Sequence, residues 1–275
     1  MVVQHNLTAA NTNRQLGITT NGLQKSTEKL SSGYKINRAA DDAAGLSISE
    51  KMRNQIRGLN KASDNAQDGI SLVQTAEGAL NEVHSMLQRM SELAVQAANG
   101  TNQTVDRSAI ASEVTQLKTE IARVGSTTQF NKMNILDGKG LGAGGKTTLQ
   151  VGANSNQVIT LQISALKSVV GKTISNISVS SIGKATAAIT VIQKAITDLS
   201  TLRSKLGAIQ NRLEHTVANL DNISENTQAA ESRIRDTDMA EEMVQYSKNN
   251  ILQQAGQSML AQANQANQGV LSLLQ

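Results

Sequence analysis

The stretch AAGLSISEKMRNQIRGLNKASDNAQDGISLVQTAEGALNEVHSMLQRMSELAVQAA (residues 43–98) decides the fold class of this chain. Its apolar side chains recur in steps of mostly three and four residues, which is the period of a helix that packs along a narrow seam. These positions are Met52, Ile56, Leu59, Ala66, Ile70, Val73, Leu80, Val83, Leu87, Met90, Ala94 and Ala97. The spacing predicts one helix about 80 Å long at 1.5 Å per residue. Asn99–Gly100 is expected to end it.

The segment before this helix is interpreted as a shorter helix and a connector. Residues 1–30 are mildly apolar at helical spacing, and residues 31–42 read SSGYKINRAADD. Gly33 offers a turn, and Asp41 or Asp42 is a suitable N-cap for the long helix.

The chain after residue 98 returns twice to a helical pattern, at 105–125 and at 182–230. The second of these helices would be about 70 Å long, so it should pack antiparallel against the first long helix. Between them, Thr147–Val151 and Val158–Ile163 predict a β-hairpin. The expected fold is mainly α: a long antiparallel helical rod or coiled coil with a small β-hairpin region at its distal end, and terminal helices that pair as a coiled coil. The expected sections are 1–42, 43–136, 137–181, 182–230 and 231–275.

The two ends of the chain carry no charge over long stretches. Residues 249–275 read NNILQQAGQSMLAQANQANQGVLSLLQ, and residues 1–13 also lack Asp, Glu, Lys and Arg. A low-complexity tail is one interpretation. A periodic apolar set argues against it: Ile251, Leu252, Ala255, Met259, Leu260, Val270, Leu271, Leu273 and Leu274. We therefore expect both ends to pair as helices when neighbouring copies of the chain bury them, which implies a polymer.

Composition excludes several classes of protein. The chain has no Cys, Pro or Trp, one Phe and two Tyr, and its net charge is +4 from 26 basic and 22 acidic residues. No dense basic patch with aromatic residues is apparent, so nucleic-acid binding is not expected. No stretch approaches the about 18 apolar residues of a membrane span, and Met1–Asn13 lacks the features of a signal peptide. His5, His84 and His215 are isolated, and the glycine-rich stretch 138–145 lacks the GK[ST] of a phosphate loop. We expect no catalytic, cofactor-binding or metal site, and no enzyme activity.

Three long motifs make the chain resemble bacterial flagellin, the filament subunit of the flagellum. They are LSSGYKINRAADDAAGLSISEKMRNQIRGL (30–59), LQRMSELAVQAANGT (87–101) and ENTQAAESRIRDTDMAEEMVQYSKNNILQQAGQSMLAQANQ (225–265), followed by VLSLL (270–274). The resemblance covers residues 1–136 and 182–275. It departs from the family pattern at Asn267, where the family usually has Pro.

The resemblance implies a self-polymerising, secreted subunit of the extracellular filament, with paired terminal helices innermost and a short outward-facing middle. It implies export by the flagellar type III apparatus, contacts with cap and junction proteins, and an export chaperone on the C-terminal segment. The polymerisation and chaperone residues would be Ile251, Leu252, Met259, Leu260, Val270, Leu271, Leu273 and Leu274.

The resemblance also implies recognition by Toll-like receptor 5 through Arg89, Leu93 and Glu113. The alternatives are a hook–filament junction protein and a soluble binding or immune-ligand module. The match through ILQQAGQSMLAQANQ favours flagellin over the junction protein, and the short middle argues against an adhesin.

Overall fold

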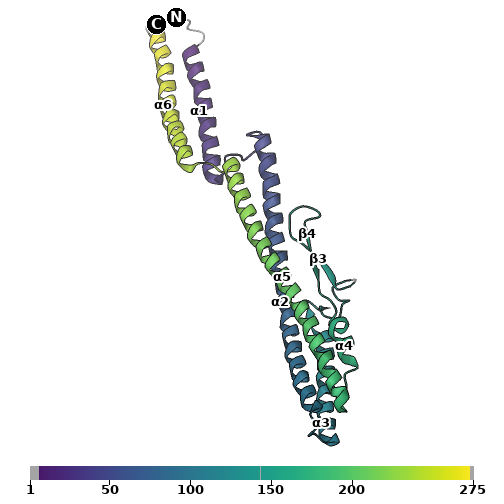
Figure 1. Ribbon diagram of the computed structural model, residues 1–275. Coiled ribbons are helices and arrows are strands. Elements are labelled where there is room, and N and C mark those ends of the chain that lie inside the picture. The colour runs from purple at the N-terminus through teal and green to yellow at the C-terminus, as the bar shows by residue number, and fades with distance from the viewer. Residues whose placement is uncertain (1–5, 143, 273–275) are drawn as a thin grey trace. The chain divides into compact units, whose positions relative to one another are not determined.

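The computed structural model describes residues 6–142 and 144–272, with side chains described through residue 265. The fold is mainly α: long helices pair as α2 with α5 and as α1 with α6, and two small two-stranded sheets complete it (Figure 1). The chain divides into two compact units. Unit 1 comprises residues up to Asn54 and from Glu225 onward, and unit 2 comprises Gln55–Ser224.

Unit 2 is built around α3 (Thr104–Thr127) and the larger parts of α2 (Ala43–Ala98) and α5 (Ile182–Arg235), whose first and last turns, respectively, belong to unit 1. The bounds of α2 confirm the helix predicted from the apolar period. The helices share one apolar core, whose fully buried side chains include Leu80, Leu87, Met90, Ile121, Ile192 and Leu199. The buried residues described in this core are all aliphatic or Met, and the partly buried Phe130 packs against them.

Polar side chains set the register of α2 against α5. The Ser63 hydroxyl donates to Asp221 Oδ1 at 3.1 Å, and the Ser224 hydroxyl donates to Asn60 Oδ1 at 2.7 Å. Both serines are buried. Position 63 therefore faces 221 and position 60 faces 224, which makes the two helices antiparallel as predicted. A shift in register would leave these buried groups without partners, at a cost of about 1–3 kcal/mol each.

The predicted hairpin is confirmed. β3 (Lys146–Gln150) pairs antiparallel with β4 (Val158–Gln162), and Thr148 lies opposite Thr160. The hairpin rests on α2, where Asn65 Nδ2 donates to the Gln150 carbonyl at 3.1 Å. A Cβ at Gly69 would meet the Leu149 side chain, so the absence of a side chain at this turn of α2 allows the strand to approach.

Four short elements of unit 2 were not predicted. β1 (Gln129–Phe130) and β2 (Met133–Asn134) form a second hairpin, whose turn residues Asn131 and Lys132 have φ of 48° and 64°. A single π-helical turn η1 (Lys167–Gly171) runs into α4 (Lys172–Ser175). These elements are too short to leave a periodic signal in the sequence.

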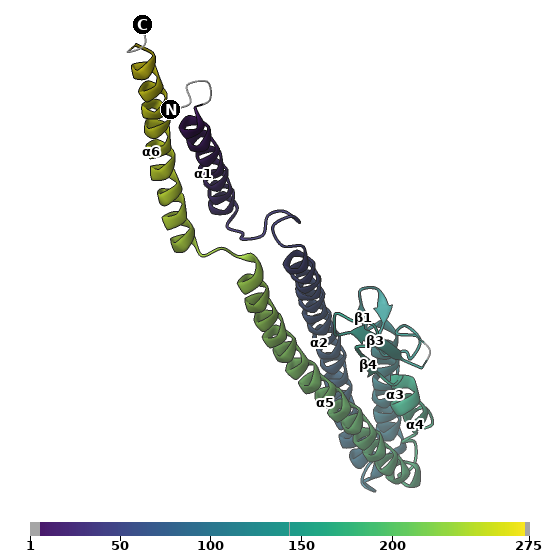
Figure 2. The same ribbon diagram turned by 90° about the horizontal axis from the view of Figure 1, so that it is seen from above.

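Unit 1 contains α1 (Leu7–Ser32) and α6 (Met239–Ser272), which lie side by side in two views (Figures 1 and 2). Gly33 ends α1 in the left-handed conformation at φ 76°, as its place in the connector predicted. Of the two candidate caps, Asp42 caps α2 by accepting the Gly45 N–H at 2.9 Å. The Asp41 carboxylate instead accepts the N–H of Arg38, and this backbone hydrogen bond lowers the pKa of Asp41.

The break between the last two helices lies later than expected. α5 continues to Arg235, beyond the predicted end at residue 230. Asp238 supplies the reason, because its Oδ1 accepts the N–H groups of Ala240 and Glu241 and so starts α6. Within the described part of the chain, none of the helices is apolar enough over a sufficient length to cross a bilayer.

Candidate functional site

The α1–α6 pair is the candidate site, because it brings together the two charge-free ends of the chain. The helices run antiparallel: Asn6 Nδ2 donates to the Ala263 carbonyl at 3.1 Å, and Lys29 Nζ lies 3.4 Å from Glu242 Oε2. The predicted pairing of the terminal helices is confirmed, and it is made within a single chain.

Small residues allow close approach at the middle of this seam. A Cβ on Gly256 would lie 3.2 Å from Leu16 Cδ1, and a Cβ on Gly22 would lie 3.2 Å from Asn249 Nδ2. Apart from Ser26, every described side chain of α1 remains at least partly exposed. Two helices alone therefore bury little of their surface.

One face of α6 is directed at α1. It carries Glu242, Asn249, Gly256 and Ala263, which repeat every seven residues and make the contacts given above. Leu260 follows Gly256 by four residues and precedes Ala263 by three, so it shares this face and is half-buried. Leu260 therefore belongs to the seam within the chain.

A second face of α6 borders an open groove between the two helices, with a volume of about 800 Å³. Leu252 and Met259 line it from α6, and polar side chains such as Thr8, Asn11 and Gln15 line it from α1. Met259 remains 57% exposed.

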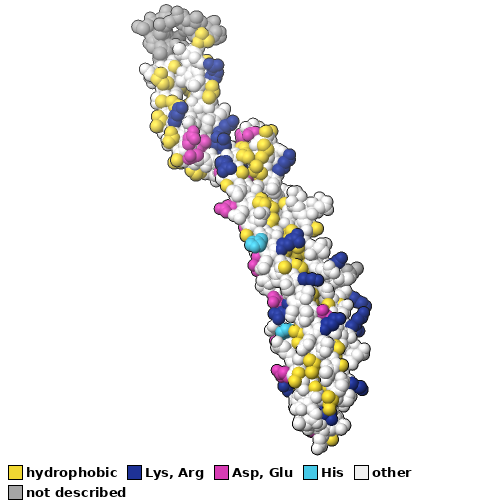
Figure 3. Space-filling view, in the orientation of Figure 1, with side chains coloured by type: hydrophobic (Ala, Val, Ile, Leu, Met, Phe, Trp, Pro, Cys, Tyr) yellow, Lys and Arg dark blue, Asp and Glu magenta, His cyan; other side chains and the backbone are white. Residues whose placement is uncertain are grey.

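A third face of α6 points away from α1 altogether. Val244 and Ile251 are two helical turns apart, and both are 66% exposed. Figure 3 shows hydrophobic side chains open to solvent along α6. A helix that is apolar on several faces is typically enclosed by other helices. Further helices can therefore pack against α6 on two sides: on the face that borders the groove, and on the face of Val244 and Ile251, which we call the outer face.

Part of the predicted polymerisation segment lies beyond what is described. The side chains of Val270 and Leu271 lie outside the described residues, as do Leu273 and Leu274 entirely.

The two connectors that lead into this helix pair are hydrogen-bonded to each other. The Lys35 N–H donates to the Arg235 carbonyl at 2.7 Å, and the Thr237 N–H donates to the Gly33 carbonyl at 3.0 Å. This short bridge holds the start of α6 beside the end of α1.

One side chain, Arg235, reinforces the bridge. Its guanidinium lies 4.7 Å from the centroid of the Tyr34 ring, and its Nη1 lies 2.8 Å from Glu50 Oε1. The hydrogen bond from Arg235 lowers the pKa of Glu50. Sequence reasoning did not identify this contact, since its three members are far apart along the chain. The one hint in the sequence was Tyr34 itself, because the chain has only two tyrosines and one of them lies in the connector.

The residues predicted for receptor recognition fall into two groups. Arg89 Nε lies 3.0 Å from Glu113 Oε1, so α2 and α3 bring these exposed side chains together as an ion pair. That hydrogen bond raises the pKa of Arg89. Leu93 is only 1% exposed and packs in the core of unit 2. It therefore offers no surface of its own.

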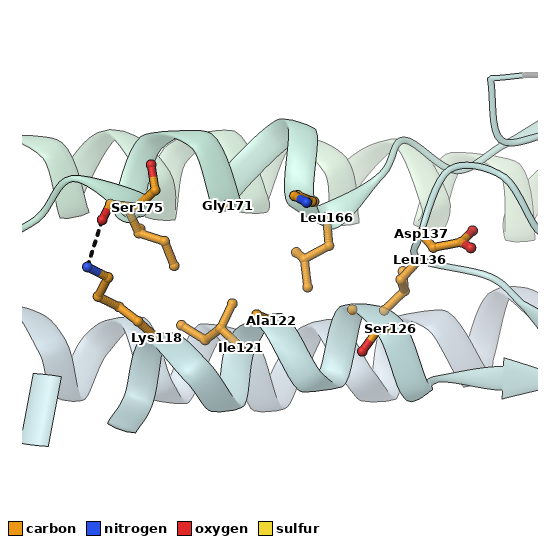
Figure 4. Close-up of a pocket in the computed structure, with 12 residues that line it drawn as sticks. Lys118, Ile121, Ala122, Ser126, Leu136, Asp137, Leu166, Gly171 and Ser175 are labelled. Atoms are coloured by element: carbon orange, nitrogen blue, oxygen red, sulfur yellow. Dashed lines mark hydrogen bonds between the residues drawn. The ribbon is translucent and has the colours of Figure 1, made fainter. Parts of the chain in front are cut away.

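Elsewhere in unit 2 a groove of about 390 Å³ separates α3 from η1 and α4 (Figure 4). Ile121 and Leu166 point into it from opposite sides, and Lys118 Nζ donates to the Ser175 carbonyl at 2.8 Å. Two charged side chains line the groove, and both already have main-chain partners: Lys118 Nζ donates to carbonyls, and the Asp137 carboxylate accepts the N–H groups of its own turn. Among the described residues, no group of three or more His, Asp or Glu side chains is placed to hold a metal ion.

Comparison with known proteins gives consistent matches along the chain. Residues 3–140 match the family described as the bacterial flagellin N-terminal helical region, and residues 189–274 match the bacterial flagellin C-terminal helical region. A flagellin of Halalkalibacterium halodurans is 55% identical over 275 residues, with both chains covered completely. A flagellin of Bacillus subtilis is 48% identical over 303 residues, again with both chains covered completely.

Two solved structures are similar in fold. The crystal structure of Bacillus cereus flagellin aligns with a TM-score of 0.53 and 33% identity, covering 57% of this chain and 88% of that one. A putative flagellar hook-associated protein from Vibrio parahaemolyticus aligns with a TM-score of 0.59, covering 71% of this chain and 100% of that one. At 12% identity, the second likeness concerns the fold alone.

Proposed function

The chain belongs to the bacterial flagellin family and is a structural, non-enzymatic subunit of the extracellular flagellar filament, and we propose that its α1–α6 pair supplies the surface that neighbouring subunits bury. The observation that carries the proposal is the exposure of large apolar side chains on a helix that has no charge after Lys248. An isolated helix pair gains nothing from keeping such a surface in water.

Burial energies support this assignment. Fully burying a Val, Leu, Ile or Met side chain contributes about 1.5–3 kcal/mol. The exposed side chains of α6 include Val244, Ile251, Leu252 and Met259. Association of copies along α6 would therefore yield several kcal/mol per subunit, and the uncharged Gln and Asn side chains around them can be buried at far lower cost than charges.

Amide hydrogen exchange tests this placement. We expect residues 251–259 to exchange about 100-fold more slowly in filaments than in the monomeric chain, because burial by neighbours suppresses local opening. Residues 110–121 of α3 provide an internal control, since Ile110 and Ile121 are already buried within unit 2. Equal exchange of 251–259 in monomer and filament would contradict the proposal.

Before assembly, the same exposed surface of α6 is the proposed docking site of the export chaperone. A chaperone that covers Ile251, Leu252 and Met259 would keep the apolar faces from associating prematurely. Passage through the type III apparatus and assembly beside cap and junction proteins complete this proposed route. A chain without cysteine is compatible with it, since no disulfide would have to be reduced before threading.

The Arg89–Glu113 ion pair is the proposed contact for Toll-like receptor 5. Both side chains are exposed and held together across α2 and α3, so they present a fixed pattern of charge. Arg is frequent among residues that dominate binding energy at interfaces. Leu93 enters this proposal as a positioning residue, because it is buried.

Changing Arg89 and Glu113 together to Ala is expected to weaken binding to the receptor ectodomain about 10-fold or more. The free energy of unfolding should change little, because the pair is solvent-exposed. The matched control is Glu120→Ala with Arg123→Ala, which removes another exposed ion pair of α3. Equal receptor binding by the two double variants would remove the assignment.

A further inference from the structure

The positive charge of this chain is concentrated in its middle. Residues 124–197 contain seven lysines and one acidic residue, Asp137. The rest of the chain holds 19 basic and 21 acidic residues and is slightly negative. The net charge of +4 therefore arises from one segment, although the total gives no hint of it.

The lysine side chains of this segment are open to solvent. All seven lysines are exposed, and none of them forms an ion pair within the part of the chain that the structure describes. Asp137 is occupied by its own turn, where its Oδ1 accepts the N–H groups of Lys139 and Gly140 at 2.7 and 2.8 Å. These backbone hydrogen bonds are the main cause that lowers the pKa of Asp137, and the nearby charge of Lys139 lowers it further without forming an ion pair.

Hydrogen bonds between loops bring five of the lysines onto neighbouring segments of unit 2. The Leu166 N–H donates to the Leu136 carbonyl at 2.9 Å, and the Ile163 N–H donates to the Gly145 carbonyl at 2.9 Å. The chain around 136–146 is thereby joined to the chain around 163–167. Five lysines lie on these segments, on the turn beside them and on the helical turn that follows. We call them the basic cluster: Lys132, Lys139, Lys146, Lys167 and Lys172.

Backbone contacts also place the other two lysines of the basic cluster, Lys172 and Lys132, beside these segments. The Lys172 N–H donates to the Lys167 carbonyl, which places these residues one turn apart. A Cβ on Gly140 would lie 2.7 Å from the Asn134 nitrogen, so the turn at Lys132 adjoins the loop of Lys139. In Figure 3, Lys and Arg side chains gather along the edge of unit 2 that carries the strands and α4.

We propose that the basic cluster binds an acidic polysaccharide, one that carries sulfate or phosphate groups, outside the cell. Lysine is a flexible point charge that accepts anions of varied spacing, whereas nucleic-acid recognition depends on Arg forks and aromatic stacking. The segment 124–197 has no Arg, and its single aromatic residue, Phe130, packs against the core of unit 2. These features favour a flexible polyanionic glycan over a nucleic acid.

The test uses the full chain as a monomer, with heparin as the sulfated probe and neutral dextran as the blank. Changing all five lysines of the basic cluster to Gln should raise the Kd for heparin about 10-fold or more and flatten its dependence on salt. The matched control changes Lys25, Lys35, Lys51, Lys205 and Lys248 to Gln. These lysines are also exposed, and the loss of charge is the same. The control should shift the Kd by less than about threefold, because these lysines lie outside the basic cluster.

Two further measurements keep the proposal falsifiable. A variant with all five cluster lysines changed to Arg retains the charge and should bind heparin as the parent chain does. Equal losses in the cluster and control variants would show a net-charge effect only and would overturn the proposal. Tighter, cluster-dependent binding to a single-stranded oligonucleotide of the same charge would overturn it in favour of nucleic acid. Absence of heparin binding at physiological salt would also refute it.

Discussion

Removing residues 249–275 is expected to abolish polymerisation while leaving unit 2 folded. The deletion takes away both apolar faces of α6, including Ile251, Leu252 and Met259, and it removes most of the partner surface of α1. The core of unit 2 contains none of these residues, so most of its helical content should persist. Seeded assembly followed by electron microscopy gives the first readout, and far-ultraviolet circular dichroism gives the second.

The truncation separates two explanations of the uncharged C-terminus. A dispensable tail would allow the shortened chain to form normal filaments from seeds. A surface that subunits share would prevent elongation at any concentration of seeds. Normal filaments from the truncated chain would refute the role proposed for α6.

Two single substitutions on α6 should have different effects on the monomer and the same effect on assembly. Ile251→Asp places a charge on the outer face, where the side chain is 66% exposed in the single chain. The monomer should keep its stability, whereas assembly should fail, because a charge buried without a partner at a subunit seam costs several kcal/mol. Measured as critical concentration, a loss of about 3 kcal/mol corresponds to more than about 100-fold.

Leu260→Asp acts at the seam between α1 and α6. It should also prevent assembly, but it should in addition loosen the helix pair in the monomer, because Leu260 shares the face that carries Gly256 and Ala263. Limited proteolysis should therefore cut α1 and α6 faster in Leu260→Asp than in Ile251→Asp. Ser155→Asp in the exposed turn between β3 and β4 controls for the added charge. Unaltered assembly of Ile251→Asp, or equal proteolysis of the two variants, would contradict these placements.

The long helices could be predicted because their signal is repeated many times. In α2 the apolar residues recur over more than fifty positions, so the predicted bounds 43–98 agree with the helix observed. The hairpin of β3 and β4 was also predictable, since two alternating runs flank a polar turn. β1, β2 and η1 span too few residues for any period to emerge.

The candidate site was only half predictable, and Leu260, Ile251 and Leu93 show why. The spacing of apolar residues predicted that α6 is apolar on several faces, but this spacing does not show which of those faces contacts α1. Leu260 was expected at a subunit seam and lies at the seam within the chain. Ile251 lies on the outer face. Leu93 was expected to take part in receptor recognition with Arg89, but the packing of unit 2 buries it in the core.

By itself, the sequence determined the helical period, the antiparallel partners and the uncharged character of both ends, because these depend on the order of apolar and charged residues along one chain. Only the tertiary structure decided what each face contacts. Tyr34 meets Arg235, Arg89 meets Glu113, and the loops of the basic cluster adjoin, because each of these contacts joins residues that are distant in the chain. A local sequence pattern shows which residues make up a helix face. Which residues that face contacts depends on how the whole chain packs.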